Sequence, residues 1–237
     1  MISTLMTVVC PTGQDNLLES LVRLYGRLGD IVDGRREFGG FVAPIDLGEK
    51  YHMKVENYPR LTMSFSNEDR RSLSGYAGMS AKDLLACAAT PLERLAVATL
   101  WKQADLGKIR HIAAGIVENE SEKRTNHAET DAPVFRQFGR HLSNPASQPI
   151  ADQHTLRAYR YHQEQNIYDS RHRLNTVKAQ EVKEYAAWVQ VLANREPSLG
   201  KSDRMYEFDQ SMFALGKATK AFIIAVSGMT PRKRKVA

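Results

Sequence analysis

The residues with the clearest chemical potential lie in one short segment, 145–160, where two prolines are followed by a carboxylate and several basic side chains. Asp152 follows Pro149 by three positions and precedes His154 and Arg157 by two and five. Prolines interrupt the preceding structure and Asp is a favoured helix cap, so we expect a helix to begin at Asp152. A carboxylate held there can stabilise positive charge that develops in a transition state. It can equally be an ordinary cap.

Residues 149–158 read Pro-Ile-Ala-Asp-Gln-His-Thr-Leu-Arg-Ala and resemble the segment of helix-hairpin-helix DNA glycosylases that carries the catalytic aspartate. The match consists of the aspartate, the histidine and the arginine at the spacing of that family, and it covers about ten of the 237 residues. The usual Leu-Pro-Gly-Val-Gly run of the hairpin is absent, and residues 130–133, Thr-Asp-Ala-Pro, stand in its place. The resemblance implies a divergent member of the endonuclease III-like superfamily.

The resemblance also implies a mostly α fold, a two-lobed helical bundle with a cleft between the lobes. We therefore expect residues 1–230 to form one such domain, with Asp152 at the mouth of the cleft, and residues 231–237 to form a basic disordered tail. Residues 33–66 depart from helical patterning, because glycines and prolines separate short β-prone pieces at 41–45 and 61–65. We expect a small irregular or β-containing insertion there.

Hydrolysis of an N-glycosidic bond gives the sugar carbon cationic character, and the resemblance makes Asp152 the carboxylate that stabilises it. Family members that also cut the strand use a lysine about eighteen residues before the aspartate as a Schiff-base nucleophile. That position is Val134 here, and no lysine occurs between Lys123 and Lys178. The resemblance thus implies a monofunctional DNA glycosylase that removes a flipped-out damaged or modified base and leaves an abasic site. Modified bases of foreign DNA, such as phage DNA, are a candidate substrate.

Two further sets of residues complete the expected site. The DNA-binding set consists of basic side chains on the Asp152 helix and on the helix before it: His154, Arg157, Arg160, Arg136 and Arg140. The base pocket is expected to use aromatic or amide side chains that can hold an unstacked base: Trp101, Gln103, Tyr159 and Tyr161. Each set has a plain alternative, because arginines at helical spacing often form a solvated face and aromatic residues often belong to the core.

A non-catalytic helical module that binds DNA or a protein partner is the alternative function, and the incomplete hairpin favours it. Other chemistries find less support. The sequence contains no His-Glu-x-x-His, no glycine-rich phosphate loop and no Gly-x-Ser-x-Gly. Cys10 and Cys87 are too few for a four-cysteine iron–sulfur cluster. We therefore expect neither a metal nor another cofactor.

Helical patterning covers most of the remaining chain. Ser80 with Asp83, and Thr90 with Glu93, form capping-box patterns, so we expect two helices to begin at these residues. Residues 118–131 are strongly polar and indicate a linker. Apolar spacing predicts further helices over residues 14–32, 109–117, 133–142, about 171–194 and 203–227.

The charge of the chain is compatible with a polyanionic partner. It has 33 basic and 27 acidic residues, a net charge of +6, and residues 231–235 carry four of the cations, which leaves +2 (6 − 4) for the rest. This excess favours DNA as the partner. No apolar run approaches the roughly eighteen residues of a membrane span, and no signal peptide is evident. We expect a cytoplasmic monomer with no membrane partner.

Overall fold

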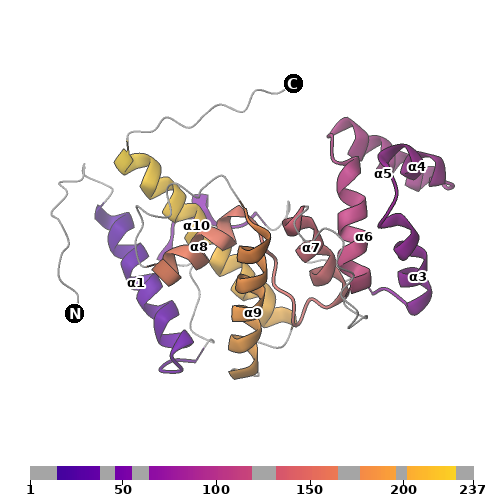
Figure 1. Cartoon of the computed structure of the whole chain (residues 1–237). Coiled ribbons are helices and arrows are strands. Elements are labelled where there is room, and N and C mark those ends of the chain that lie inside the picture. The colour runs from indigo at the N-terminus through magenta and orange to yellow at the C-terminus, as the bar shows by residue number, and fades with distance from the viewer. Residues whose placement is uncertain are drawn as a thin grey trace.

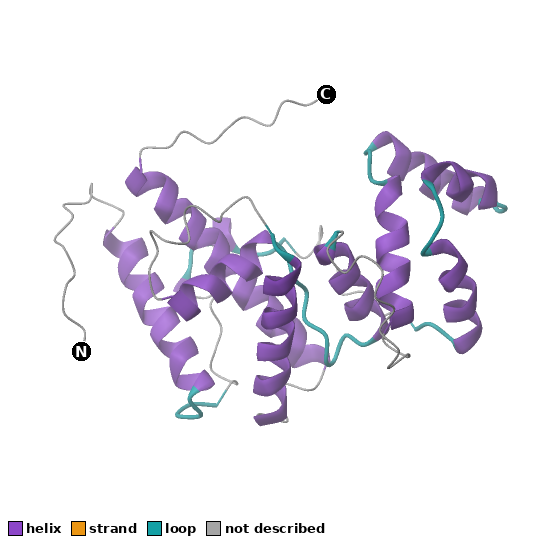
Figure 2. Ribbon diagram, in the orientation of Figure 1, coloured by secondary structure: helices purple, strands orange, loops and turns teal. Residues whose placement is uncertain are grey.

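The computed structural model describes residues 15–37, 46–54, 64–118, 132–164, 177–195 and 202–227 (Figure 1). These residues are mostly helical, and no strand occurs among them (Figure 2). The mostly α prediction is confirmed. In chain order the helices are α1 (Asp15–Val32), the 3-10 helix η2 (Glu49–Tyr51), α3 (Asn67–Tyr76), α4 (Ala81–Cys87), α5 (Pro91–Lys102), the 3-10 helix η3 (Leu106–Lys108), α6 (Ile109–Glu118), α7 (Pro133–Ser143), α8 (Gln153–Glu164), α9 (Ala179–Arg195) and α10 (Ser202–Ser227).

Helix α10 lies at the centre of the apolar core. It packs against α1 and α8, and residues of α9 belong to the same buried cluster. Met205, Phe208, Met212 and Leu215 recur at helical spacing and are each 0% exposed. Full burial of one such side chain contributes about 1.5–3 kcal/mol, so this face of α10 holds the surrounding helices together.

Helices α6 and α7 approach each other closely through two glycines. A Cβ added to Gly115 would lie 2.0 Å from the carbonyl oxygen of Arg136, and one added to Gly139 would lie 2.1 Å from that of Ile112. No side chain fits at either position, so glycine at both is what allows the two backbones to meet. The helical pair α6–α7 is therefore fixed by backbone contact.

Helices α3, α4 and α5 lie on the far side of α6 from the core (Figure 1). No described residue of α3 or α5 is buried. Large apolar side chains of α5 face solvent, and Leu92, Leu95 and Trp101 are 75%, 64% and 66% exposed. This part of the chain is therefore held mainly by α3 against α6 and by local contacts.

The predicted helices agree with the observed ones in most places. The capping boxes at Ser80 and Thr90 begin α4 and α5. Helix α3 was not predicted, although Ser66 and Asp69 form the same capping box at its start. Helix α9 begins at Ala179, several residues later than predicted.

The predicted insertion at 33–66 is only partly described. Its described residues contain the short helix η2 and no strand, which fits an irregular segment. The expected β-prone piece at 41–45 lies outside the described residues, and so do residues 61–63 of the second expected piece, 61–65. Residues 119–131 of the expected linker and the tail 231–237 also lie outside them.

Candidate active site

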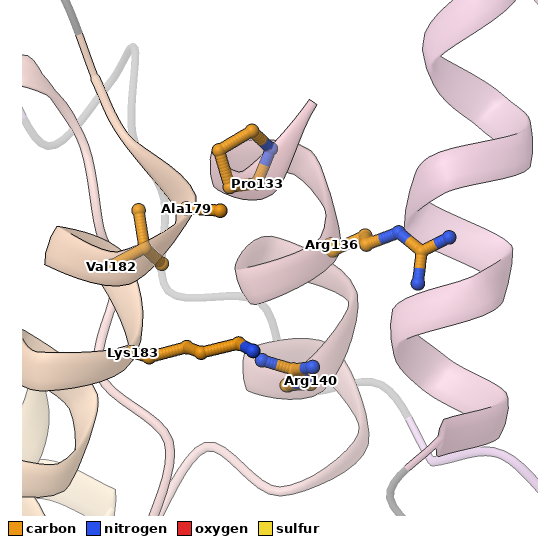
Figure 3. Close-up of a pocket in the computed structure, with 6 residues that line it drawn as sticks. All are labelled: Pro133, Arg136, Arg140, Ala179, Val182 and Lys183. Atoms are coloured by element: carbon orange, nitrogen blue, oxygen red, sulfur yellow. The ribbon is translucent and has the colours of Figure 1, made fainter. Parts of the chain in front are cut away.

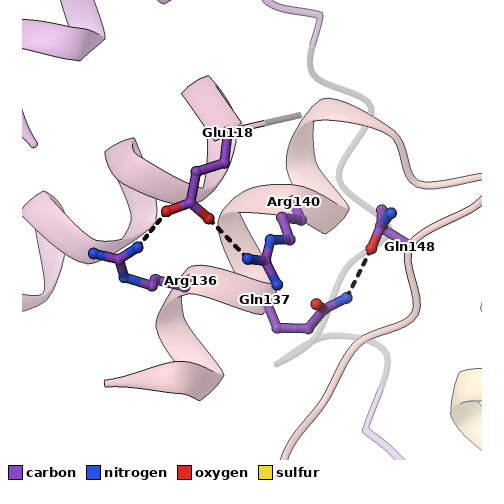
Figure 4. A network of polar contacts seen from close by, with 5 residues as sticks. All are labelled: Glu118, Arg136, Gln137, Arg140 and Gln148. Atoms are coloured by element: carbon purple, nitrogen blue, oxygen red, sulfur yellow. Dashed lines mark hydrogen bonds and ion pairs between the residues drawn. The ribbon is translucent and has the colours of Figure 1, made fainter. Parts of the chain in front are cut away.

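The segment that leads to Asp152, residues 144–152, is held to α7 by buried polar contacts. Nε2 of Gln137 donates to Oε1 of Gln148 at 3.2 Å (Figure 4). The same nitrogen donates to the carbonyl oxygen of Pro149 at 3.0 Å. Nδ1 of His141 lies 2.7 Å from the carbonyl oxygen of Gln148. Burial lowers the pKa of His141, so the ring is neutral at pH 7 and donates through Nδ1.

The same segment is also held to α10. The amide of Ile150 donates to both carboxyl oxygens of Asp209, at 3.2 and 3.1 Å. Asp209 is 0% exposed. Contacts from α7 and from α10 therefore fix the backbone just before Asp152.

Asp152 is the N-cap of α8. Its Oδ1 accepts hydrogen bonds from the amides of His154 at 2.7 Å and Thr155 at 2.8 Å, and its own amide donates to Oγ1 of Thr155 at 2.8 Å. These reciprocal bonds satisfy amides that the first turn of a helix otherwise leaves unpaired. Oδ2 has no hydrogen-bond partner among the described residues. One carboxylate oxygen thus caps the helix, and the other accepts no hydrogen bond from a described residue; the Asp152 side chain is half-buried.

His154 follows Asp152 on the first turn of α8 and is neutral at pH 7. Burial lowers the pKa of His154 to about 4, nearby positive charges including Arg157 add to this effect, and Asp152 opposes it. Nδ1 of His154 lies 3.0 Å from Nη1 of Arg157, and its ring lies edge-on to Phe213 at 4.7 Å. Since an arginine only donates, Nδ1 is the acceptor and the ring hydrogen is on Nε2.

Arg157 lies beneath this histidine and not at the surface. It is 1% exposed, and its Nη1 also donates to the carbonyl oxygen of Gly216 on α10 at 3.2 Å. Burial lowers the pKa of Arg157 to about 10, which still leaves it charged at pH 7. The buried Arg157 therefore adds positive charge to the site and, through its hydrogen bond to Nδ1, orients His154.

An open pocket of about 380 Å³ lies beside His154. Most of its lining is basic or apolar, and the lining contains no carboxylate: Lys50, Tyr51, His154, Lys217, Lys220, Ala221 and Ile224. Burial, and then the charge of Arg157, lower the pKa of Lys220. Three lysines with no acid among them make this pocket suitable for an anionic group.

The two predicted DNA-binding arginines of α7 form a separate cluster. Glu118 of α6 accepts from Nη1 of Arg136 and, at 2.8 Å, from Nη2 of Arg140 (Figure 4). Both arginines also line a small pocket between α7 and α9, from which Arg136 extends away toward α6 (Figure 3). Its other lining residues are Pro133, Ala179, Val182 and Lys183. Glu118 neutralises part of the positive charge here.

Three other predicted residues of α8 pack against neighbouring helices. Arg160 is 6% exposed and forms an ion pair with Glu181 of α9. Tyr159 packs against the ring of Trp188 at 5.2 Å, and Tyr161 against that of Tyr25 at 4.1 Å. Both tyrosines adjoin the apolar core. In this structure the contacts of the two tyrosines are those of core aromatic residues.

Trp101 and Gln103 lie far from these groups along the structure. Trp101 is on the last turn of α5, and Gln103 is the C-cap of that helix. Helix α5 packs against α4 and η3, and Figure 1 shows it beyond α6, away from α8. The structure therefore brings together Asp152, His154 and Arg157, but it does not bring Trp101 or Gln103 to them.

Several buried or charged side chains near Asp152 and His154 were not predicted as part of the site, because they come from elements distant in the sequence. Asp209, Lys217 and Lys220 lie on α10, Tyr185 on α9, and Lys50 on η2. A signal for one of them was present. Asp209 interrupts the buried apolar positions of α10, and an acid there calls for a specific partner.

No family model matches the sequence, and neither the curated proteins nor the solved structures provide a match. Within the described ranges, no three His, Cys, Asp or Glu residues are grouped as metal ligands. None of the described helices combines the length and the apolar character needed to cross a membrane.

Proposed function

We propose that this protein is a monofunctional DNA N-glycosylase in which Asp152 is the catalytic carboxylate. One observation carries the proposal. Oδ2 of Asp152 accepts no hydrogen bond from a described residue, and His154, whose amide donates to Oδ1, lines the lysine-rich pocket. The candidate carboxylate is thus hydrogen-bonded to a residue that lines a site for anions. A hydrolase of the DNA N-glycosidic bond requires both a carboxylate and a site for the DNA phosphates.

The roles of the residues follow from their charges. Lys50, Lys217 and Lys220 attract the phosphates that flank the target nucleotide, and Nε2–H of His154 can donate to one phosphate oxygen. Oδ2 of Asp152 stabilises the positive charge that forms on the sugar as the base departs and can orient the attacking water. The fixed backbone of residues 144–152 keeps this oxygen in place. The substrate is a damaged or modified base, and modified bases of phage DNA are the first to test.

The test compares the wild type with Asp152→Asn on duplexes that carry different modified bases, with alkali to reveal abasic sites. Asparagine caps a helix about as well as aspartate, so Asp152→Asn preserves α8 and removes only the charge. We expect alkali-dependent cleavage by the wild type and a loss of about 10²–10⁴-fold in the variant. Asp203→Asn, which removes an exposed carboxylate of α10, is the matched control. Equal cleavage by the wild type and Asp152→Asn would contradict the role of Asp152.

A non-catalytic DNA-binding module is the second candidate, and the capping bonds of Asp152 favour it. A carboxylate that serves only as a cap needs no substrate, and the predicted DNA ligands Arg157 and Arg160 are buried. This candidate predicts salt-dependent DNA binding by the wild type and Asp152→Asn alike, with abasic sites from neither.

A further inference from the structure

Asp209 is a buried acid whose only hydrogen-bond partner among the described residues is the backbone of the Asp152 segment. Both of its oxygens accept from the amide of Ile150, which lies 59 positions earlier in the chain and two before Asp152. The side chain is 0% exposed, and it forms no ion pair with any described residue. A fully buried carboxylate with one amide donor and no cation is poorly stabilised in its charged form.

The groups that face Asp209 oppose its ionisation. Burial is the main cause that raises the pKa of Asp209 well above its ordinary value, and the charge of Asp152 raises it further, while the Ile150 amide acts in the opposite direction. Tyr185 of α9 is 0% exposed, and burial is the main cause that raises the pKa of its hydroxyl as well. Asp209 and Tyr185 are therefore both expected to be protonated, next to the carboxylate of Asp152.

We propose that Asp209 is a positioning residue that holds a proton in the folded protein, ties the Asp152 segment to α10, and leaves Asp152 as the single negative charge of the site. Its effect on catalysis rests on the proposed glycosylase function. Its protonation does not. If Asp209 were ionised, it would repel Asp152 and bury a charge without a counterion.

Proton linkage tests the protonated state without any substrate. Aspartate in an unfolded chain is ionised above about pH 5, so unfolding of the wild type releases a proton from Asp209. The equilibrium constant for unfolding of the wild type should therefore rise about tenfold per pH unit relative to that of Asp209→Asn. This rise should extend from about pH 5 up to the pKa of Asp209 in the folded state. Asparagine keeps an oxygen for the Ile150 amide and cannot ionise. The control Asp203→Asn should follow the wild type. Equal pH dependence in the wild type and Asp209→Asn would overturn the proposal.

A measurement on the wild type covers the case in which Asp209→Asn does not fold. In protein whose aspartates carry ¹³C at the side-chain carboxyl carbon (Cγ), ¹³C NMR should show one Cγ resonance of a protonated carboxyl group at pH 7. That resonance should persist in Asp152→Asn, because it belongs to Asp209. A spectrum in which every carboxyl group is ionised at pH 7 would overturn the proposal.

Base excision then tests positioning. Asp209→Ala removes the contact with Ile150 and should lower kcat by about tenfold or more with a smaller change in KM. Asp209→Asn should restore most of this loss, because it keeps the acceptor. An asparagine variant as slow as the alanine variant would contradict the positioning role. A wild type that makes no abasic sites would remove the glycosylase proposal, and the linkage experiment would still decide the protonation of Asp209.

Discussion

Gly216 of α10 lies so close to α8 that a Cβ added to it would be 1.8 Å from the carbonyl oxygen of His154. The carbonyl oxygen of Gly216 in turn accepts from Nη1 of Arg157 at 3.2 Å. The first turn of α8, which carries the candidate active site, therefore packs directly against the backbone of α10. Glycine at this position is a condition for the whole site.

We predict that Gly216→Ala destabilises the protein by about 1–3 kcal/mol or more, because the added methyl group meets backbone that cannot rotate away. Denaturant unfolding measures the change. Gly26→Ala in α1 is the matched control, since nothing lies within 4 Å of its added Cβ, and it should stabilise by about 0.5–1 kcal/mol. Equal stability of Gly216→Ala and the wild type would show that the two helices are farther apart in solution.

Replacement of Asp152 should separate its capping role from its chemical role. Asp152→Ala removes both bonds to Oδ1 and should cost roughly 1 kcal/mol of stability, whereas Asp152→Asn should cost only a few tenths. Chemical unfolding of both variants, alongside base excision, gives the two readouts. The glycosylase proposal predicts two inactive proteins of different stability. Activity in the asparagine variant would assign Asp152 to capping alone.

The burial of His154 predicts a loss of stability in acid. Its folded pKa of about 4 is below the ordinary value of 6.5, so the folded state favours the neutral ring. The resulting stability is fully present above pH 6.5 and is lost as the pH falls from 6.5 toward 4. His154→Gln should therefore show a smaller decrease in unfolding free energy over this range than the wild type. A ring resonance of His154 that titrates near 6.5 by NMR would contradict this prediction.

Glu118 should limit the affinity of the α7 arginines for DNA. Glu118→Gln leaves Arg136 and Arg140 without their shared carboxylate, so we expect a stability loss of roughly 1 kcal/mol and tighter DNA binding. If both arginines then contact phosphates, the slope of log K against log salt should steepen by about 1–2. Glu68→Gln on exposed α3 changes the net charge equally and serves as control. Identical affinities for the two variants would place the α7 arginines outside the DNA interface.

The sequence by itself determined the local features of this protein. Ser80, Thr90 and Asp152 all begin helices as predicted, because a cap depends on residues only two or three positions away in the chain. The apolar spacing of α1 and α10 was sufficient for the same reason, since helical periodicity is a short-range property. The helix at Ser66 carried an equivalent signal.

Only the tertiary structure decided which side chains meet. It placed Asp209 and Gly216 against the Asp152 segment and left Trp101 exposed on α5, away from it. Such meetings depend on the rotation and separation of packed helices, and at Gly216 that separation is set by the absence of a single Cβ. A sequence pattern shows which face of a helix is buried, but it does not show which distant residue lies opposite that face.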